Sequence, residues 1–466
     1  MSVRVDDTKA PLRVAVVGAG LGGLTAAHAI RREARAQGRS LELEVWEARE
    51  RPGGLLGTLI EDGFLVEWAA NAFRTGLGPT ADLLERLGLL GEQVHADTAA
   101  NRRYVFHGGR LHLLPSDPIS LLNFTPMSRE GRLRVMAELF LAGRVEHEES
   151  VHDYAARHIG PEAAEVLLGT MVRGVYGGNA HELSVDAAFP IMREMERDHR
   201  SLVIAAIAGM PKRMRERKTT WSFRAGMDVL IERLSEDLGT AVRSGTPACE
   251  LTQDQASGRY LLRSTDGVDQ PFDAVVLTVP AHAAADLLET LDAPAALEIR
   301  GIPSAPIAVV ALAFAREAWR TVPDGFGFLV APGEDLQILG ALIESNVFPG
   351  RAPPGTVLVR VIMGGVDHPE LIGRTDAELE SVALDALDRA WGIAGEPLRS
   401  WVVRQASGIP QYVMGHGARL ARIEERLRPF PGIQVAGNAF RGVAVGKLVE
   451  DAEIVAAAVW SAATSR

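Results

Sequence analysis

The sequence predicts an α/β protein with a Rossmann-like nucleotide-binding unit that is built from both ends of the chain. Residues 13–17 form a short β-branched strand, a glycine-rich turn follows at 18–23, and an Ala-rich helix continues from it. Residues 433–450 repeat the same order of strand, glycine-rich turn and helix. Because this order of elements cradles a pyrophosphate, we expect one dinucleotide held between the two ends.

The glycines of the first turn differ in the role that we expect of each. Gly18 permits the tight turn, Gly20 lets the backbone approach a pyrophosphate, and Gly23 lets the helix pack closely on its strand. A second strand over 41–46 ends at Glu47, near the spacing of ~20 residues at which a carboxylate hydrogen-bonds a ribose hydroxyl. The motif alone is weak in a chain with 47 glycines among 466 residues, but the strand, helix and acid around it make it specific.

The segment after Glu47 favours FAD over NAD. It places Gly53 and Gly54 among basic residues, and a backbone this open can run alongside an extended cofactor. At the other end of the chain, the N-terminus of the last helix is expected to face the electron-rich edge of a flavin, where its dipole stabilises negative charge. The FAD-binding residues predicted from both ends are Gly18, Gly20, Leu21, Gly22, Gly23, Glu47, Ala48, Arg49, Gly53, Gly54, Leu55, Gly437, Asn438 and Gly442.

Composition narrows the class of protein. A chain of 466 residues has room for about three domains, and a net charge of −11 argues against nucleic acid as a partner. With one cysteine, Cys249, we expect no disulfide and no Cys-based zinc site, and the twelve histidines lack metal-ligand spacing, so no metal is predicted. We expect Cys249 to be a buried strand residue. Residues 1–10 do not read as a signal peptide, which predicts a cytoplasmic protein, soluble or attached to a membrane surface.

Between the two ends the sequence predicts a helical insertion and a separate sheet. Residues 61–67 read as a hairpin-like strand, and most of the segment from 80 to about 217 has helical spacing. Further strands are expected at 241–251, 259–263, 273–280, 307–314, 327–330, 337–343 and 356–363, with a helix over 375–391. We therefore predict FAD-binding parts at 1–80, 218–285 and 411–466, a helical domain at 81–217, and a mixed or antiparallel-sheet substrate-binding domain at 286–410.

The helical insertion carries a membrane hypothesis and a plain alternative to it. Apolar runs lie at 115–126 and 202–210, and a basic cluster follows the second run at 211–218. An apolar face beside basic residues can lie on an anionic bilayer. In the alternative, the apolar residues pack into the core and the basic ones form a solvated rim, and the residues alone favour this alternative slightly.

Several motifs together resemble the protoporphyrinogen oxidase family of the flavin amine oxidase superfamily. The similarity runs from about residue 13 to 457, and its motifs are the FAD-binding start and residues 101–104, 174–179, 183–190, 223–226, 325–329, 409–412 and 437–447. The resemblance implies an FAD enzyme that oxidises a porphyrinogen by six electrons with three molecules of oxygen and releases peroxide. It implies hydride transfer from a meso carbon to flavin N5 without a catalytic side-chain base. It also favours membrane binding by the helical insertion over the core-packing alternative. The protein is then expected on the inner face of a membrane.

The resemblance also assigns individual residues. Arg103 matches a propionate-binding arginine, and Leu329, Leu342 and Met363 match apolar positions that sandwich the macrocycle; many relatives have phenylalanine where this chain has Met363. The FAD contacts that it adds are Ala70, Asn71, Val242, Val443, Ala444 and Val445. Many relatives have Gly-Pro-Asn where this chain has 69–71. A homodimer and docking on a ferrochelatase are further expectations.

Three other hypotheses stay open. A coproporphyrinogen oxidase would use the same flavin chemistry on a substrate with four carboxylates, in a wider and more basic pocket, without membrane attachment. Arginines that could line such a pocket are Arg51, Arg74, Arg102, Arg103 and Arg110. A flavin amine oxidase is disfavoured because no lysine stands where those enzymes usually have it. A non-catalytic FAD scaffold, docking on a ferrochelatase or a membrane complex, is the third.

Overall fold

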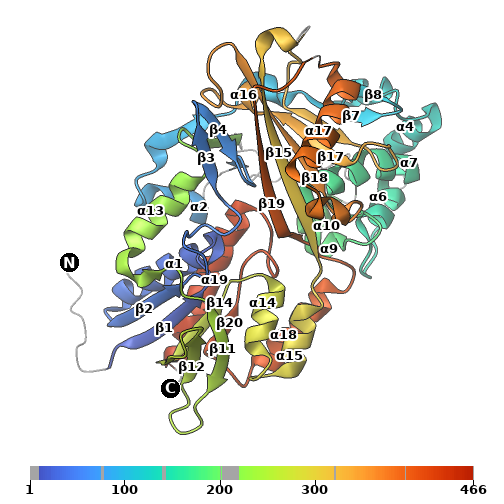
Figure 1. Cartoon of the computed structure of the whole chain (residues 1–466). Coiled ribbons are helices and arrows are strands. Elements are labelled where there is room, and N and C mark those ends of the chain that lie inside the picture. The colour runs from blue at the N-terminus through green and yellow to red at the C-terminus, as the bar shows by residue number, and fades with distance from the viewer. Residues whose placement is uncertain are drawn as a thin grey trace.

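Two sheets organise the molecule, one near the chain termini and one far from them (Figure 1). The computed structural model describes residues 10–74, 78–138, 143–199, 201, 220–319, 322–393 and 395–464. The first sheet has five strands in the order β10-β2-β1-β14-β20, and the second has seven in the order β19-β15-β18-β17-β16-β7-β8. Helices cover both sheets.

The five-stranded sheet is parallel throughout and unites the two ends of the chain, as predicted. Its strands are β1 (Leu12–Val17), β2 (Leu41–Trp46), β10 (Val242–Arg243), β14 (Ala274–Leu277) and β20 (Ile433–Val435). The helices α1 (Leu21–Gln37), α13 (Asp228–Leu238) and α19 (Val445–Thr464) pack on it. The Rossmann-like fold expected from both ends of the sequence is confirmed.

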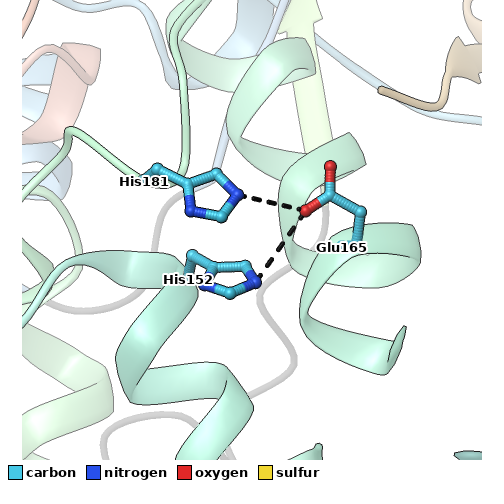
Figure 2. Close-up of side chains that lie close together, drawn as sticks. All are labelled: His152, Glu165 and His181. Carbon is cyan, nitrogen blue, oxygen red and sulfur yellow. Dashed lines mark hydrogen bonds and ion pairs between the residues drawn. The ribbon is translucent and has the colours of Figure 1, made fainter. Parts of the chain in front are cut away.

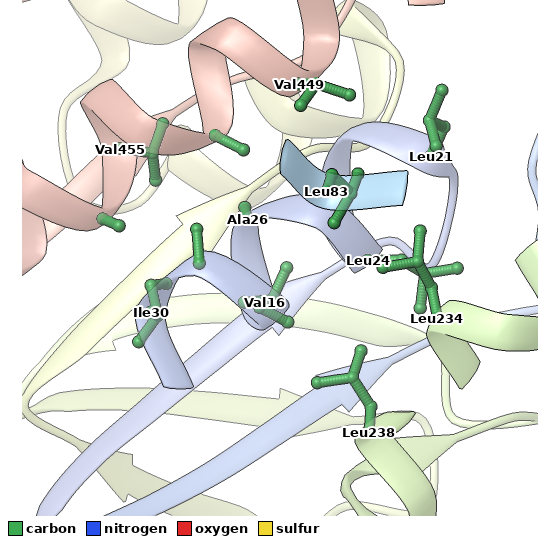
Figure 3. Close-up of a cluster of buried hydrophobic side chains, with 14 of the residues drawn as sticks. Val16, Leu21, Leu24, Ala26, Ile30, Leu83, Leu234, Leu238, Val449 and Val455 are labelled. Atoms are coloured by element: carbon green, nitrogen blue, oxygen red, sulfur yellow. The ribbon is translucent and has the colours of Figure 1, made fainter. Parts of the chain in front are cut away.

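A single apolar cluster fixes these helices on the sheet (Figure 3). Val16 of β1, Leu24 of α1, Leu234 of α13 and Val455 of α19 are all fully buried in it, although they come from three distant parts of the chain. Truncating such a side chain to alanine typically costs about 2–5 kcal/mol. Apolar contacts between residues far apart in the sequence therefore hold the glycine-rich turns in place at the cofactor end of the molecule.

The seven-stranded sheet is the mixed sheet that the sequence predicts for the substrate end. Neighbouring strands are antiparallel except β16 and β7, which are parallel. Its strands are β7 (Arg103–His107), β8 (Arg110–Leu113), β15 (Ser304–Ala315), β16 (Gly327–Val330), β17 (Ile338–Ile343), β18 (Thr356–Gly364) and β19 (Arg399–Pro410). The helix α17 (Asp376–Trp391) packs on one face, as expected, and the side chain of Thr375 caps its N-terminus.

Two strands of this sheet come from the segment that was expected to be helical. Strands β7 and β8 lie within 81–217 and extend the sheet past β16. The rest of that segment, as far as the structure describes it, is mainly helical and lies beside the sheet (Figure 1). Its helices are α3 (Pro118–Leu122), α4 (Arg129–Met136), α6 (Val151–Ile159), α7 (Pro161–Ala163), the π-helical turn η3 (Ala164–Gly169), α8 (Thr170–Tyr176), α9 (Val185–Ala188) and α10 (Pro190–His199).

Smaller elements complete the fold. They are the hairpin β3 (Thr58–Glu61) and β4 (Phe64–Glu67), the small sheet β5 (Phe73–Arg74), β6 (Gln93–His95) and β9 (Thr220–Phe223), the small sheet β11 (Ala248–Gln253), β12 (Tyr260–Ser264) and β13 (Asp269–Phe272), and the helices α2 (Pro79–Arg86), α14 (Ala281–Leu288), α15 (Ala293–Arg300), α16 (Glu344–Val347) and α18 (His416–Leu427). Two segments that carry the membrane hypothesis, the apolar run at 202–210 and the basic cluster at 211–218, lie outside the described residues. In the parts of the chain that the structure does describe, no helix combines the length and the apolar character needed to cross a membrane.

Candidate active site

A cavity of about 1100 Å³ runs from the glycine-rich turns of the parallel sheet to one face of the seven-stranded sheet. Most of the predicted cofactor residues line it: Gly18, Gly20, Leu21, Gly22, Glu47, Ala48, Arg49, Gly53, Gly54, Leu55, Ala70, Gly437, Asn438, Val443 and Val445. The structure does not bring five others to its wall: Gly23, Asn71, Val242, Gly442 and Ala444. The cavity therefore joins the predicted cofactor segments from both ends of the chain.

The first turn has the backbone shape that a pyrophosphate requires. Gly18 has φ +102°, which favours glycine, and a Cβ on Gly23 would lie 1.8 Å from the carbonyl oxygen of Gly18. Gly20 differs, because its φ is −70° and the nearest atom to an added Cβ is Cα of Gly54 at 3.8 Å. Glycine at Gly20 thus leaves space beside the N-terminus of α1, where helix N–H groups favour phosphate oxygens.

Glu47 is fixed at the end of β2 by backbone hydrogen bonds. Its carboxylate accepts from the N–H of Ala19 at 2.8 Å and from the N–H of Arg49 at 3.0 Å. The side chain is buried, with 7% of it exposed, and it lines the cavity. A carboxylate has about four acceptor positions, so the same group can also accept from ribose hydroxyls. The residues at this end therefore fit the adenosine part of FAD.

The second turn is held by a residue whose role the sequence did not indicate. The Tyr412 hydroxyl donates to the carbonyl of Asn438 at 2.6 Å and accepts from the N–H of Gly442 at 2.7 Å. Burial raises the pKa of Tyr412 well above its ordinary value, so the phenol stays neutral and keeps both hydrogen bonds. Tyr412 belongs to the motif at 409–412, one of those that carry the resemblance to the family. A sequence motif does not reveal which backbone groups a tyrosine hydroxyl connects.

The substrate end of the cavity is an apolar face made by three neighbouring strands. Ile307 of β15, Leu339 of β17 and Ile362 of β18 line it, and Val175 of α8 lines it as well. Side chains alternate between the two faces of a strand, so Met363 points the other way. Met363 is fully buried in the cluster against α17 and does not line the cavity. Ile362, one position before Met363, lines the cavity, and a role of Met363 with the substrate stays a prediction.

The other three predicted substrate residues do not line the cavity. Leu329 packs on Gly174, whose added Cβ would lie 2.6 Å from a methyl carbon of Leu329, and Gly174 lines the cavity. Leu342 is buried on β17. The guanidinium of Arg103 is exposed and lies 4.9 Å from the ring centre of Phe326. Their roles with substrate stay predictions.

The arginines proposed for a more basic pocket are engaged elsewhere. Arg51 pairs with Asp228, Arg102 pairs with Asp324, and Arg110 lies beside His112. These three and Arg103 do not line the cavity. The side chain of Arg74 lies outside the described residues. Cys249 lies on a strand as expected, but it is exposed and lines the cavity, so its expected burial is wrong.

A buried polar network joins the cofactor unit to the seven-stranded sheet. Glu67 of β4 pairs with Arg351 at 2.9 Å, and Asn71 donates to Glu344 at 3.0 Å, which also pairs with Arg360 at 2.9 Å. All five side chains are buried. Burial raises the pKa of Glu67, and the charge of Arg351 opposes that rise. The amide of Asn71 is thus used on Glu344, away from the cavity.

The fold and this cavity define a flavoprotein oxidoreductase. The chain belongs to the flavin-containing amine oxidoreductase family, whose model matches residues 21–460. FAD is its cofactor, and when bound it supplies the two-electron acceptor. The glycine turns, Glu47 and the cavity volume fit that group.

Individual relatives place the chain among the porphyrinogen oxidases. It is 30% identical over 475 residues to a protoporphyrinogen oxidase of Homo sapiens, covering 96% of this chain and 98% of the relative. It is 28% identical over 454 residues to a coproporphyrinogen III oxidase of Bacillus subtilis (strain 168), covering 94% and 95%. A candidate protoporphyrinogen oxidase from Exiguobacterium sp. 255-15 superposes with a TM-score of 0.84 at 26% identity, covering 97% of this chain and 99% of that one. The resemblance to the protoporphyrinogen oxidase family is confirmed.

Proposed function

We propose that the enzyme oxidises protoporphyrinogen IX to protoporphyrin IX. Six electrons and six protons leave the substrate in three rounds, and three O₂ become three H₂O₂. The observation that carries this proposal is the continuity of one cavity from the flavin-binding turns to an apolar strand face. A largely apolar macrocycle with few charged groups suits such a face, because burying it removes apolar surface from water.

The residues of the apolar face orient the substrate and exclude water. Ile307, Leu339 and Ile362 form one wall, and Val175 comes from the helix α8. We assign no catalytic base, because the pyrrole nitrogens of the substrate can release protons as the macrocycle tautomerises. The cofactor contacts of Gly23, Val242, Gly442 and Ala444 stay predictions, and the resemblance implies that the contact of Val242 is made by its backbone.

A second candidate is the oxidation of coproporphyrinogen III. The observation that favours it is the match to the Bacillus subtilis enzyme over 95% of that relative. Four carboxylates call for several cations, and the arginines that line the described cavity are Arg49 and Arg300. Arg300 already pairs with Asp286 and Glu289, so we favour the substrate with two carboxylates. An amine oxidase is disfavoured, since Lys447, the lysine within the described residues, is exposed and pairs with Glu450.

A parallel assay of both substrates tests the proposal. Purified protein with its FAD is supplied with protoporphyrinogen IX or coproporphyrinogen III under air, while porphyrin fluorescence and peroxide are recorded. We expect faster turnover of the first substrate, with three peroxides for each porphyrin. Preference for the second substrate would move the enzyme to coproporphyrin formation. No turnover of either would overturn porphyrinogen oxidation and favour the scaffold hypothesis.

We also propose that the helical region touches a membrane surface on the cytoplasmic side. Ile119 and Leu122 of α3 and Leu133 of α4 are exposed large apolar residues, with Ile119 74% exposed. Such residues insert at the headgroup boundary when a helix lies on a bilayer. Sedimentation with anionic vesicles tests this, and the variant Ile119→Ser with Leu133→Ser should sediment less. Equal sedimentation of the variant and the unaltered protein would contradict the proposal.

The domain boundaries, a homodimer and ferrochelatase docking stay predictions.

A further inference from the structure

Three side chains from separate segments of the helical region converge on its surface (Figure 2). They are His152 of α6, Glu165 of η3 and His181 of the loop after α8. Nε2 of His181 lies 3.3 Å from Oε2 of Glu165, and Nε2 of His152 lies 3.9 Å from the same oxygen. The two imidazole rings stack with their centres 3.8 Å apart. No regular spacing in the sequence could reveal this group.

We propose that His152, Glu165 and His181 bind one divalent transition-metal ion of the Zn²⁺ class. Ligand atoms at the usual 2.0–2.2 Å from a tetrahedral Zn²⁺ lie about 3.4 Å from one another. All three potential ligand atoms lie within 4.8 Å of one another here. Side-chain movements that close gaps of up to about 1.4 Å between these atoms would seat the ion. Two imidazoles and a carboxylate suit Zn²⁺, Co²⁺, Ni²⁺ or Cu²⁺ better than Mg²⁺ or Ca²⁺, which prefer oxygen ligands.

The backbone around the two histidines is fixed by hydrogen bonds. The N–H of His152 donates to the carbonyl of Ala180 at 2.9 Å, which ties the start of α6 to the loop that carries His181. The N–H of His181 donates to Oδ1 of Asn179 at 3.0 Å. A rigid frame of this kind loses little freedom when an ion binds.

Two further observations point to a ligand. Glu165 lies in a π-helical turn, and such turns occur frequently at functional sites. The other ring nitrogen of His152, Nδ1, lies 3.3 Å from a carboxylate oxygen of Asp153. A carboxylate behind a histidine ligand orients the ring and raises its basicity in metal sites.

The site is open to solvent and separate from the flavin cavity. Side-chain exposure is 16% for His152, 43% for Glu165 and 53% for His181, and none of the three lines the cavity. Water can therefore complete the coordination. Glu165 and His181 bracket α8, which supplies Gly174 and Val175 to the cavity wall. The ion would thus clamp both ends of a wall segment, a stabilising role independent of the proposed reaction.

Zinc titration of the whole FAD-loaded protein, free of any histidine tag and stripped with a chelator, tests the proposal. Calorimetry with Zn²⁺ alone should give one ion per chain, and Zn²⁺ should raise the melting temperature. His181→Ala and Glu165→Gln should abolish both effects, and Asp153→Asn should weaken binding by about tenfold or more. The control His95→Ala removes an exposed histidine elsewhere and should bind as the unaltered protein does.

The zinc titration distinguishes a metal site from a group of hydrogen-bonded side chains. One saturable site that disappears in His181→Ala and persists in His95→Ala would support the assignment. No saturable binding to the unaltered protein, or equal binding by His181→Ala, would overturn it and leave the three side chains as a hydrogen-bonded group only. Both ligand variants alter exposed side chains, and flavin absorbance reports whether each variant has folded.

Discussion

The two ends of the cavity are built in different ways. At the cofactor end, two short segments supply backbone groups and glycines, with Gly20 in the turn between β1 and α1 and Gly437 in the longer turn between β20 and α19. At the substrate end, single side chains such as Ile307 and Ile362 come from separate strands of one sheet. A site made of backbone follows from local motifs, whereas a site made of one sheet face depends on strand register.

The network between the two ends should give the largest effect. Arg351→Met leaves the Glu67 carboxylate buried without its partner at 2.9 Å. Breaking a buried ion pair in this way typically costs about 3–5 kcal/mol of unfolding free energy. We expect a clear fall in melting temperature, measured on the FAD-loaded protein. The double variant Arg351→Met with Glu67→Gln should recover part of the loss, and no recovery would contradict the pairing argument.

The same variant should change how stability depends on pH. Burial raises the folded-state pKa of Glu67 above its unfolded value, so ionisation of this carboxyl opposes folding. The resulting penalty is absent below the unfolded pKa and grows as pH rises through the folded pKa. Without Arg351 the pKa rises further, so the destabilisation by Arg351→Met should be larger at pH 8 than at pH 5. An equal loss at both pH values would contradict this account.

Gly20→Val should separate cofactor binding from folding. Gly20 has an ordinary φ of −70° and open space beside it, so valine fits the backbone but occupies the place of the pyrophosphate. A steric overlap of about 1–3 kcal/mol weakens FAD binding by roughly 10–100-fold. Flavin content after gel filtration measures this. Gly91→Ala, where an added Cβ meets nothing within 4 Å, is the control. Full flavin retention by Gly20→Val would contradict the placement.

The contrast between the ends explains what the sequence could and could not predict. The strands, the turns and Glu47 were predictable because their signals lie within a few residues of each other. Strands β7 and β8 were missed because they are short, and β7 pairs with β16 more than 200 residues away. Ile362 was missed for another reason: it differs from Met363 by one position, and one position in a strand reverses the face.

Ile362→Ala against Met363→Leu tests the register of the substrate end. Ile362 lines the cavity, so its truncation should lower kcat/KM for the porphyrinogen by about tenfold, as expected for lost apolar contact with a substrate. Met363→Leu conserves volume on the opposite face and should cost less than about 1.5 kcal/mol of stability with little change in kcat/KM. Steady-state kinetics on the substrate that turns over measures both. A larger effect on kcat/KM from Met363→Leu than from Ile362→Ala would restore the original assignment.

Arg103→Ala should give the smallest effect. Its guanidinium is exposed and lies over the ring of Phe326. An exposed charge pair contributes about 0–1 kcal/mol, so contact with a substrate propionate predicts a rise in KM of up to about fivefold with unchanged flavin content. Arg102→Ala is the matched control, since Arg102 is also exposed and pairs with Asp324. If KM rises only for Arg103→Ala, the propionate lies at the edge of the sheet beside β7 and the macrocycle reaches beyond the strand face. If KM is unchanged, Arg103 does not contact the substrate. The side chains of the strand face then hold the macrocycle without this cation, and the contrast with the cofactor end becomes sharper.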